Sequence, residues 1–273
     1  MMKYKITLEY DGTNYSGWQN QKNAKSIQGT LIHAAQKLFG PDVDIQGAGR
    51  TDAGVHALEQ VAHLSVSKKM PAVKIRDGLN DLLPANINIL KVEEAPTTFH
   101  ARHHAKARSY IYIVSKSRTA FGKKYVWWIK DPLNIRQMRT TLSVFKDFHN
   151  FASFADKRRD KDSSDMVLIS HISLSERDDL IFIRIVASHF LWKMVRRLVG
   201  ILVEVGRGNL SKADVEDMLV RKSDIPAKFT APPSGLFLEK VYYSTDKFVA
   251  PDALGIRRND KILPVMMNRK IGK

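Results

Sequence analysis

The chain has 273 residues, 44% of them hydrophobic, which is enough to bury a substantial core in one large domain or two smaller ones. Its 44 Lys and Arg against 28 Asp and Glu give a formal net charge of +16, which favours a polyanionic partner, nucleic acid before membrane. The absence of cysteine excludes disulfides, thiolate metal sites and cysteine nucleophiles. The first ten residues do not resemble a signal peptide, and no apolar run could cross a bilayer, so we expect a soluble, cytoplasmic protein.

The first hundred residues alternate between the periods of strands and helices. Apolar side chains at every second position of 3–10 predict a strand, and Ser26 is suited to cap the helix that Gly40-Pro41 ends. In chain order, we expect a strand at 3–10, a helix at 27–39, strands at 43–48 and 61–66, a helix at 70–83 and a strand at 87–92. The order β-α-β-β-α-β is that of a ferredoxin-like unit.

The second half is predicted to be a decorated repeat of this pattern. We expect strands at 109–114, 125–129, 168–174, 180–187 and 236–243, and helices at 134–148, 190–205 and 211–222. The polar residues 176–179 predict the turn of a hairpin. The fold class is therefore α+β, with two ferredoxin-like halves, residues 1–105 and 106–273, that share a mostly antiparallel sheet with a central cleft.

The segment Gly47–Ala57 carries three glycines within eight residues, and these permit close approaches that a Cβ would block. One carboxylate, Asp52, and one cation, Arg50, stand among them. The spacing fits neither a dinucleotide-binding fingerprint nor a phosphate-binding P-loop. A tight turn capped by Asp52 is the simple alternative, but it leaves Arg50 without a role. We therefore expect a site where a large partner comes close to the backbone.

No acidic residue occurs between Glu94 and Asp131. Eight basic residues occur there instead: Arg102, Lys106, Arg108, Lys116, Arg118, Lys123, Lys124 and Lys130. Aromatic residues are interleaved with them, and cations beside stacking aromatics are typical of RNA binding. We expect Tyr112, Phe121 and one of Trp127 and Trp128 to be core residues. His100, His103 and His104 lack a nearby acid or cysteine, which favours surface or phosphate-contacting histidines over a metal site.

Three further segments carry charge. The apolar helix expected at 190–205 has Arg196 in its middle, and a buried guanidinium needs a carboxylate or phosphate partner. The mixed-charge run 157–165 predicts a mobile surface loop. The basic residues 257–273 are equally compatible with an RNA-contacting tail and with a solubilising end.

The nine residues Gly49–Ala57, GRTDAGVHA, resemble the active-site motif of the tRNA pseudouridine synthase A family. Further matches follow in the same order along nearly the whole chain: 10–19, 99–102, 108–112, 194–200 and 231–236. The resemblance implies the pseudouridine synthase fold and an isomerase that converts uridine to pseudouridine at positions 38, 39 and 40 of the anticodon arm of tRNA. It also implies a homodimer that uses no cofactor and no metal.

The resemblance also implies roles for five residues. Asp52 would be the nucleophile, and Arg50 would hold the RNA where the target base leaves its helix. Tyr110 would stack on the uracil, Arg196 would pair with Asp52, and Leu236 would line the pocket. The segments 167–169 and 188–190 depart from the family pattern, near the expected RNA path and away from the nucleophile.

Two other classes of function were weighed against this one. A non-catalytic RNA-binding module would explain the basic and aromatic surface but would give Asp52 no task. A glycoside hydrolase would need a second carboxyl group roughly 6 Å away. No other Asp or Glu lies in a comparable glycine-rich setting, which argues against the hydrolase.

Overall fold

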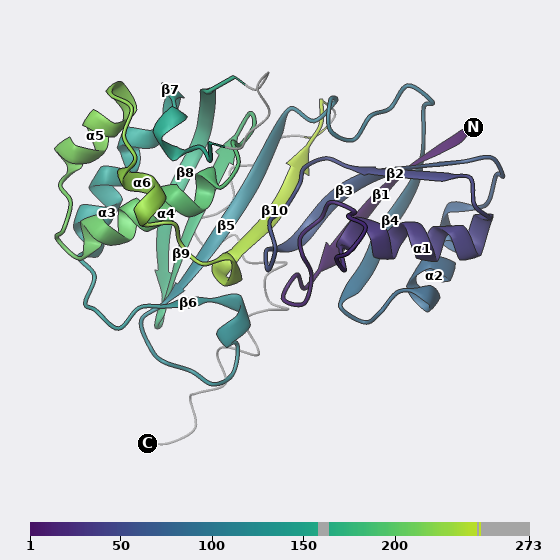
Figure 1. Cartoon of the computed structure of the whole chain (residues 1–273), viewed down its shortest axis with the longest axis horizontal. Coiled ribbons are helices and arrows are strands. Elements are labelled where there is room, and N and C mark those ends of the chain that lie inside the picture. Colours follow the sequence, from purple (N-terminus) through teal and green to yellow (C-terminus); the bar gives the residue numbers. More distant parts are fainter. Residues whose placement is uncertain (158–163, 245, 247–273) are drawn as a thin grey trace. The chain divides into compact units, whose positions relative to one another are not determined.

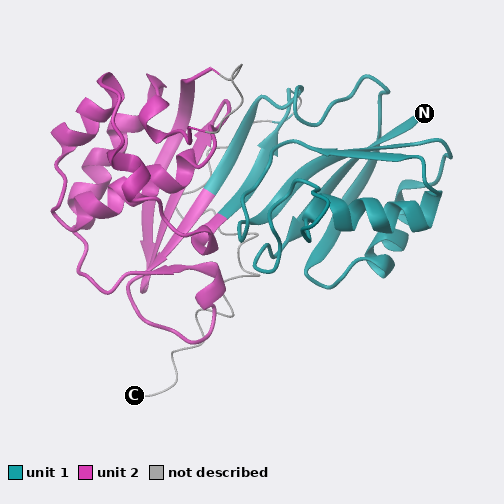
Figure 2. Ribbon diagram, viewed as in Figure 1, with its two compact units in different colours: residues 1–110, 237–246 teal, residues 111–236, 247–273 magenta. Residues whose placement is uncertain are grey.

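The structure, a computed structural model, describes residues 1–157, 164–244 and 246. The basic tail and most of the charged run 157–165 lie outside the described residues. The chain forms two compact units (Figure 2). Unit 1 comprises Met1–Tyr110 and Phe237–Asp246, and unit 2 comprises Ile111–Leu236. Unit 1 thus combines the N-terminal part of the chain with its last described strand.

Unit 1 contains the β-α-β-β-α-β order expected from the sequence (Figure 1). Its elements are β1 (Met2–Tyr10), α1 (Ile27–Phe39), β2 (Val43–Gly47), β3 (His56–Val66), α2 (Ala72–Leu82) and β4 (Ile87–Ala95). Strand β1 pairs antiparallel with β3 and β4, and β2 pairs antiparallel with β3. Strand β10 (Leu236–Tyr242) runs parallel to β3, with Phe237 opposite His56. The predicted ferredoxin-like order of elements is therefore confirmed for this segment.

Local sequence explains why these elements form. The Ser26 hydroxyl accepts a hydrogen bond from the Gly29 amide over 3.1 Å, which satisfies one of the free N–H groups at the start of α1. Gly40 ends the helix at φ 92°, a conformation that favours glycine. In β1, alternate residues from Tyr4 to Tyr10 are buried, as the period of two predicts.

Unit 2 contains the remaining elements (Figure 1). They are the end of β5 (Ala107–Ser115), β6 (Trp127–Trp128), α3 (Ile135–Leu142), β7 (Asp147–Asn150), β8 (Met166–Arg177), β9 (Leu180–Ala187), α4 (Met194–Gly206), α5 (Lys212–Val220) and α6 (Ile225–Lys228). The strand order is β5-β9-β8-β7, and β6 pairs parallel with β5. The predicted hairpin is confirmed, because β8 and β9 pair antiparallel around a turn in which Asp178 has φ 52°.

Two helix predictions in unit 2 were wrong in extent. The helix expected at 134–148 ends at Leu142, and after a short 3-10 turn the chain enters β7 at Asp147, where φ is 74°. The helix expected at 190–205 begins only at Met194, because Lys193 adopts φ 62°. The left-handed Lys193 stops α4 from beginning earlier, whereas α3 ends because the chain tightens into the 3-10 turn 143–145; the apolar pattern alone revealed neither position.

Candidate active site

The glycine-rich loop between β2 and β3 is tied by backbone hydrogen bonds to the segment that follows β1. The amide of Trp18 donates to the Thr51 carbonyl over 3.0 Å, and the amide of Gly54 donates to the Tyr15 carbonyl over 3.2 Å. The hydroxyls of Tyr10 and Thr51 are 2.8 Å apart in a buried hydrogen bond. Asp52, next to Thr51, is half-buried and therefore sits on a loop that is fixed on both sides.

Two glycines make this contact between segments possible. A Cβ on Gly12 would lie 1.9 Å from the carbonyl oxygen of Val55, and a Cβ on Gly17 would lie 2.5 Å from that of Thr51. Gly17 also has φ +93°, which side chains rarely adopt. The segment 10–19 can therefore lie against the loop only with glycine at both positions.

His56, at the start of β3, is a buried residue that contacts the segment packed against the loop. It is almost fully buried, its Nδ1 accepts a hydrogen bond from the Gly12 amide over 3.1 Å, and its ring stacks on Phe237 at 4.7 Å between centroids. The Asp11 carboxylate lies 3.2 Å from the same nitrogen. Sequence reasoning gave neither His56 nor Asp11 a role, although both stand inside the motifs that carry the family resemblance.

Tyr110 lies near Asp52 within unit 1. Its side chain is only 9% exposed, and burial is the main cause that raises the pKa of Tyr110 to about 12. The cation of Arg108 opposes this shift, and the negative charge of Asp52 adds to it, so the two sequence-predicted residues interact electrostatically. Arg108 in turn donates from Nη2 to the carbonyls of Ala48 and Arg102, both at 2.9 Å.

A raised pKa keeps the phenol of Tyr110 protonated throughout the neutral range, so the tyrosinate form is not available as a base there. If this site is catalytic, the pH profile of its activity at low substrate concentration should show no rise from Tyr110 between pH 7 and pH 10. Profiles of the wild type and of Tyr110→Phe should have the same shape over this range. A rising limb present in the wild type and absent from Tyr110→Phe would show that Tyr110 does ionise in this range and would contradict its raised pKa.

Arg196 and Leu236 lie in unit 2, so their place beside Asp52 stays a prediction. Arg196 stands in the first turn of α4, not in the middle of a helix as predicted, because α4 begins at Met194. Its Nε donates to the Ala231 carbonyl over 2.7 Å, and the Ala231 amide donates back to the Arg196 carbonyl over 3.0 Å. Leu236, 5% exposed, begins β10.

The more deeply buried guanidinium on α4 belongs to Arg197, which sequence reasoning passed over. Arg197 is 7% exposed, donates to the Ala155 carbonyl and lies 3.9 Å from a carboxylate oxygen of Asp156. Burial lowers the pKa of Arg197, and the carboxylate of Asp156 opposes that shift. A carboxylate partner, as expected for a buried arginine, is therefore present at Arg197, the residue after Arg196.

The burial of the aromatic residues in the basic stretch differs in part from the prediction. Tyr112 is fully buried, as expected. The half-buried Trp127 packs edge-on against it, with 6.3 Å between the ring centroids. The prediction for Phe121 was wrong, since 74% of its side chain is exposed. Phe121 lies in a turn, where both its N–H and its C=O bond to the hydroxyl of Thr119, rather than in a strand. Trp128 is 40% exposed.

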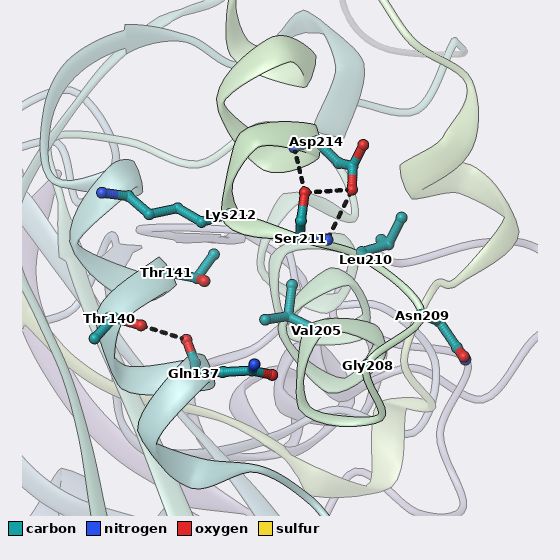
Figure 3. Close-up of a pocket in the computed structure, with 10 residues that line it drawn as sticks. All are labelled: Gln137, Thr140, Thr141, Val205, Gly208, Asn209, Leu210, Ser211, Lys212 and Asp214. Atoms are coloured by element: carbon teal, nitrogen blue, oxygen red, sulfur yellow. Dashed lines mark hydrogen bonds between the residues drawn. The ribbon is translucent and has the colours of Figure 1, made fainter.

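Two other kinds of site can be assessed in the described part of the chain. Among those residues, no group of three or more His, Asp and Glu side chains is arranged to hold a metal ion. A pocket of about 440 Å³ in unit 2 lies where α5 begins, beside Thr140, Lys212 and Asp214 (Figure 3). The Ser211 and Asp214 side chains already cap that helix reciprocally, and none of the sequence-predicted site residues lines the pocket. No helix among the described residues is both long and apolar enough for a membrane span.

Comparison with known proteins gives this arrangement its context. The sequence pattern of the family described as tRNA pseudouridine synthase matches residues 6–104 and 146–244. The chain belongs to this family. Its mixed α and β structure, with a mostly antiparallel arrangement of strands, fits the fold expected from the sequence.

Three relatives illustrate the similarity, and each is named tRNA pseudouridine synthase A. The protein of a Thermoanaerobacter species is 40% identical over 245 residues, that of Thermodesulfovibrio yellowstonii 39% over 254, and that of Bartonella tribocorum 40% over 248. In each case the match covers 89% of this chain and the whole of the relative. The similarity therefore extends over both units and includes the loop of Asp52.

Proposed function

We propose that the chain isomerises uridine to pseudouridine in tRNA, with Asp52 as the nucleophile. The observation that carries the proposal is the fixed, glycine-bounded loop that holds Asp52 near the buried Tyr110, in a chain of this family. The uracil must leave C1′, turn, and rejoin the ribose through C5; C5 then loses its proton, and N1, released from C1′, takes one up. A carboxylate can supply the nucleophile for the detachment. Substrate and product have the same atoms, so the net reaction requires no co-substrate.

The target base must leave its stem before Asp52 can reach it, at a cost of roughly a few kcal/mol of lost stacking. We assign the exposed Arg50 to hold the RNA at the vacated position, Tyr110 to stack on the uracil and Leu236 to line the pocket. Arg196 pairs with Asp52 in this proposal. The targets are uridines of the anticodon arm, at positions 38 to 40, and the enzyme acts as a cytoplasmic homodimer without cofactor. The halves 1–105 and 106–273 are its proposed domains.

The aromatic side chains of the basic stretch in unit 2, exposed at Phe121 and Trp128 and half-buried at Tyr125, support an RNA substrate. The guanidinium of Arg118 lies 5.7 Å from the centre of the Trp128 ring, and the ammonium of Lys124 lies 4.9 Å from that of Tyr125. Phe121, largely exposed, stands within the same basic stretch. Bases stack on such rings while cations neutralise phosphates. An RNA-binding module without catalysis would use this surface equally well but would leave the tRNA unmodified.

The direct test is to incubate the purified protein with unmodified tRNA and to map pseudouridine at single-nucleotide resolution. We expect conversion of uridine in the anticodon arm without added metal or nucleotide. Because several phosphates are neutralised, the logarithm of the binding constant should fall linearly with the logarithm of salt concentration, by roughly 0.7–0.9 per phosphate contact. Binding that is insensitive to salt would contradict a basic RNA surface, and tRNA bound but unchanged would favour the non-catalytic module.

Arg196→Ala separates a catalytic role from a phosphate contact. We expect strongly reduced turnover, by roughly 10²-fold or more as for other residues that align a reacting group, with tRNA affinity largely kept. The measurement is single-turnover conversion beside equilibrium binding of the same tRNA. Equal losses of turnover and affinity would identify Arg196 as a phosphate contact instead. Lys212→Ala, which removes an exposed cation elsewhere in unit 2, is the matched control.

A further inference from the structure

Unit 1 contains a pocket of about 300 Å³ beside the glycine-rich loop. It is lined by residues from three segments that are distant in sequence, among them Trp18, Gln46, Gly49, Arg50, His100 and Arg102. Neither Asp52 nor Tyr110 is part of its lining. The pocket thus adjoins the loop of the proposed nucleophile, but the residues assigned to attack and stack on the uracil do not form it.

The two glycines of this pocket differ in what requires them. A Cβ on Gly47 would lie 2.5 Å from the buried ring of Trp18, so packing inside the fold demands glycine there. A Cβ on Gly49 would meet no described atom within 4 Å, apart from its immediate chain neighbours. Gly49 is also not among the described residues with positive φ. Within the described structure, neither packing nor backbone conformation explains a glycine at position 49.

The backbone around Gly49 is nevertheless held firmly. The buried Gln60 donates from Nε2 to the Gly49 carbonyl over 2.9 Å. The preceding residue, Ala48, donates to the Val61 carbonyl over 2.7 Å and accepts from Nη2 of Arg108 over 2.9 Å. The backbone on which Gly49 lies is therefore fixed by hydrogen bonds, and the space beside its Cα is open. A side chain at position 49 would enter that space.

The lining has the mixed chemistry that a nucleotide requires. Arg50 and Arg102 are exposed guanidinium groups, and arginine is well suited to bind phosphate through two parallel hydrogen bonds. Gln19, Gln46 and Asp44 also line the pocket, and amides and carboxylates are partners for base edges. Burial lowers the pKa of His100, which keeps its imidazole neutral at physiological pH. The Gln46 amide already donates to the Asp44 carboxylate over 3.1 Å and the Gln19 amide to Gln28 over 2.9 Å, so a base edge would meet their remaining donors and acceptors.

We propose that this pocket binds a nucleotide of the tRNA that neighbours the flipped uridine, and that position 49 is glycine because this nucleotide lies against the loop backbone. The inference rests on the proposed function and adds a second RNA contact to it. Arg102 holds the phosphate in this arrangement, beside Arg50 at the vacated position, and the space that a Cβ would fill at Gly49 admits the sugar or base.

The test uses Gly49→Ala and Gly49→Val in the full chain. Because an added Cβ meets no described atom within 4 Å, Gly49→Ala should keep the wild-type melting temperature, and the melting temperature of Gly49→Val is measured beside it. We expect KM for tRNA to rise about tenfold for Gly49→Val, equivalent to about 1.4 kcal/mol, and less for Gly49→Ala, with kcat largely kept. Arg102→Ala should raise KM and lower the salt dependence by about one phosphate contact. Arg76→Ala removes an exposed cation from α2 and should change neither.

The position of the bound nucleotide can be identified by combining a lesion in the RNA with the Gly49→Val substitution and asking whether their effects on the rate are independent. Anticodon stem-loops with a single abasic nucleotide, placed in turn at each position around the target, are assayed with the wild type and with Gly49→Val. At the position that the pocket binds, the abasic lesion should slow the wild type but cost Gly49→Val little more, because the contact is already lost. Two results would overturn the inference. One is a stable Gly49→Val with the wild-type KM, and the other is an abasic lesion that slows Gly49→Val as much as it slows the wild type at every position. Failure of the wild type to form pseudouridine would instead overturn the proposed function.

Discussion

Asp52→Ala is expected to abolish pseudouridine formation while binding tRNA within a few-fold of the wild type. Removing the nucleophile eliminates the attack itself, and the loss should reach roughly 10⁴-fold or more, as when the central residues of other catalytic groups are removed. The basic and aromatic surface that binds RNA is left in place. Single-turnover conversion of tRNA, measured beside equilibrium binding, gives both quantities for one preparation.

Asp52→Asn is the sharper variant because it keeps the shape of the side chain and removes only its charge. The backbone bonds that position the loop, from Trp18 to Thr51 and from Gly54 to Tyr15, do not involve the side chain, so the melting temperature should change little. Asp81→Ala removes an exposed carboxylate from α2 and serves as the control for charge. Undiminished turnover in either Asp52 variant would refute the nucleophile assignment and with it the proposed mechanism.

Gly200→Ala is expected to destabilise unit 2 severely. An added Cβ would lie 1.5 Å from the carbonyl oxygen of Phe229 and 2.7 Å from its carbonyl carbon, so backbone must move. Overpacking costs typically 1–3 kcal/mol, and we expect at least the upper value here because no flexible side chain can yield. At roughly 2–4 °C per kcal/mol, the melting temperature should fall by about 10 °C.

The same change should lower activity, because the segment after Phe229 carries Ala231, which exchanges hydrogen bonds with Arg196. Gly206→Ala is the matched control on the same helix. Its Cβ would lie 2.7 Å from the Met138 sulfur, the flexible part of a side chain that can shift, so the loss of stability should be smaller. Equal melting temperatures for the two variants would contradict this explanation of Gly200.

Much of the fold followed from features that act over a few residues. The Ser26 cap, the alternation along β1 and the polar turn between β8 and β9 each depend on neighbours in sequence, and each was predicted. The start of α4 was not predicted, because Lys193 adopts a left-handed conformation although it is not a glycine. The end of α3 was not predicted either, because the chain enters a 3-10 turn after Leu142 while the apolar pattern continues to Phe145. Phe121 was misplaced because its exposure depends on what lies opposite it, and composition does not contain that information.

The candidate site divides in the same way. The sequence by itself determined the family, through GRTDAGVHA and the ordered segments around it, and it singled out Asp52, Arg50 and Tyr110. Only the tertiary structure decided why Gly12 must be glycine, that burial raises the pKa of Tyr110 and which arginine of α4 is buried. Those properties depend on atoms that the fold brings together from distant parts of the chain, such as Gly12 and Val55. Burial and close approach act through space, whereas capping and periodicity act along the chain.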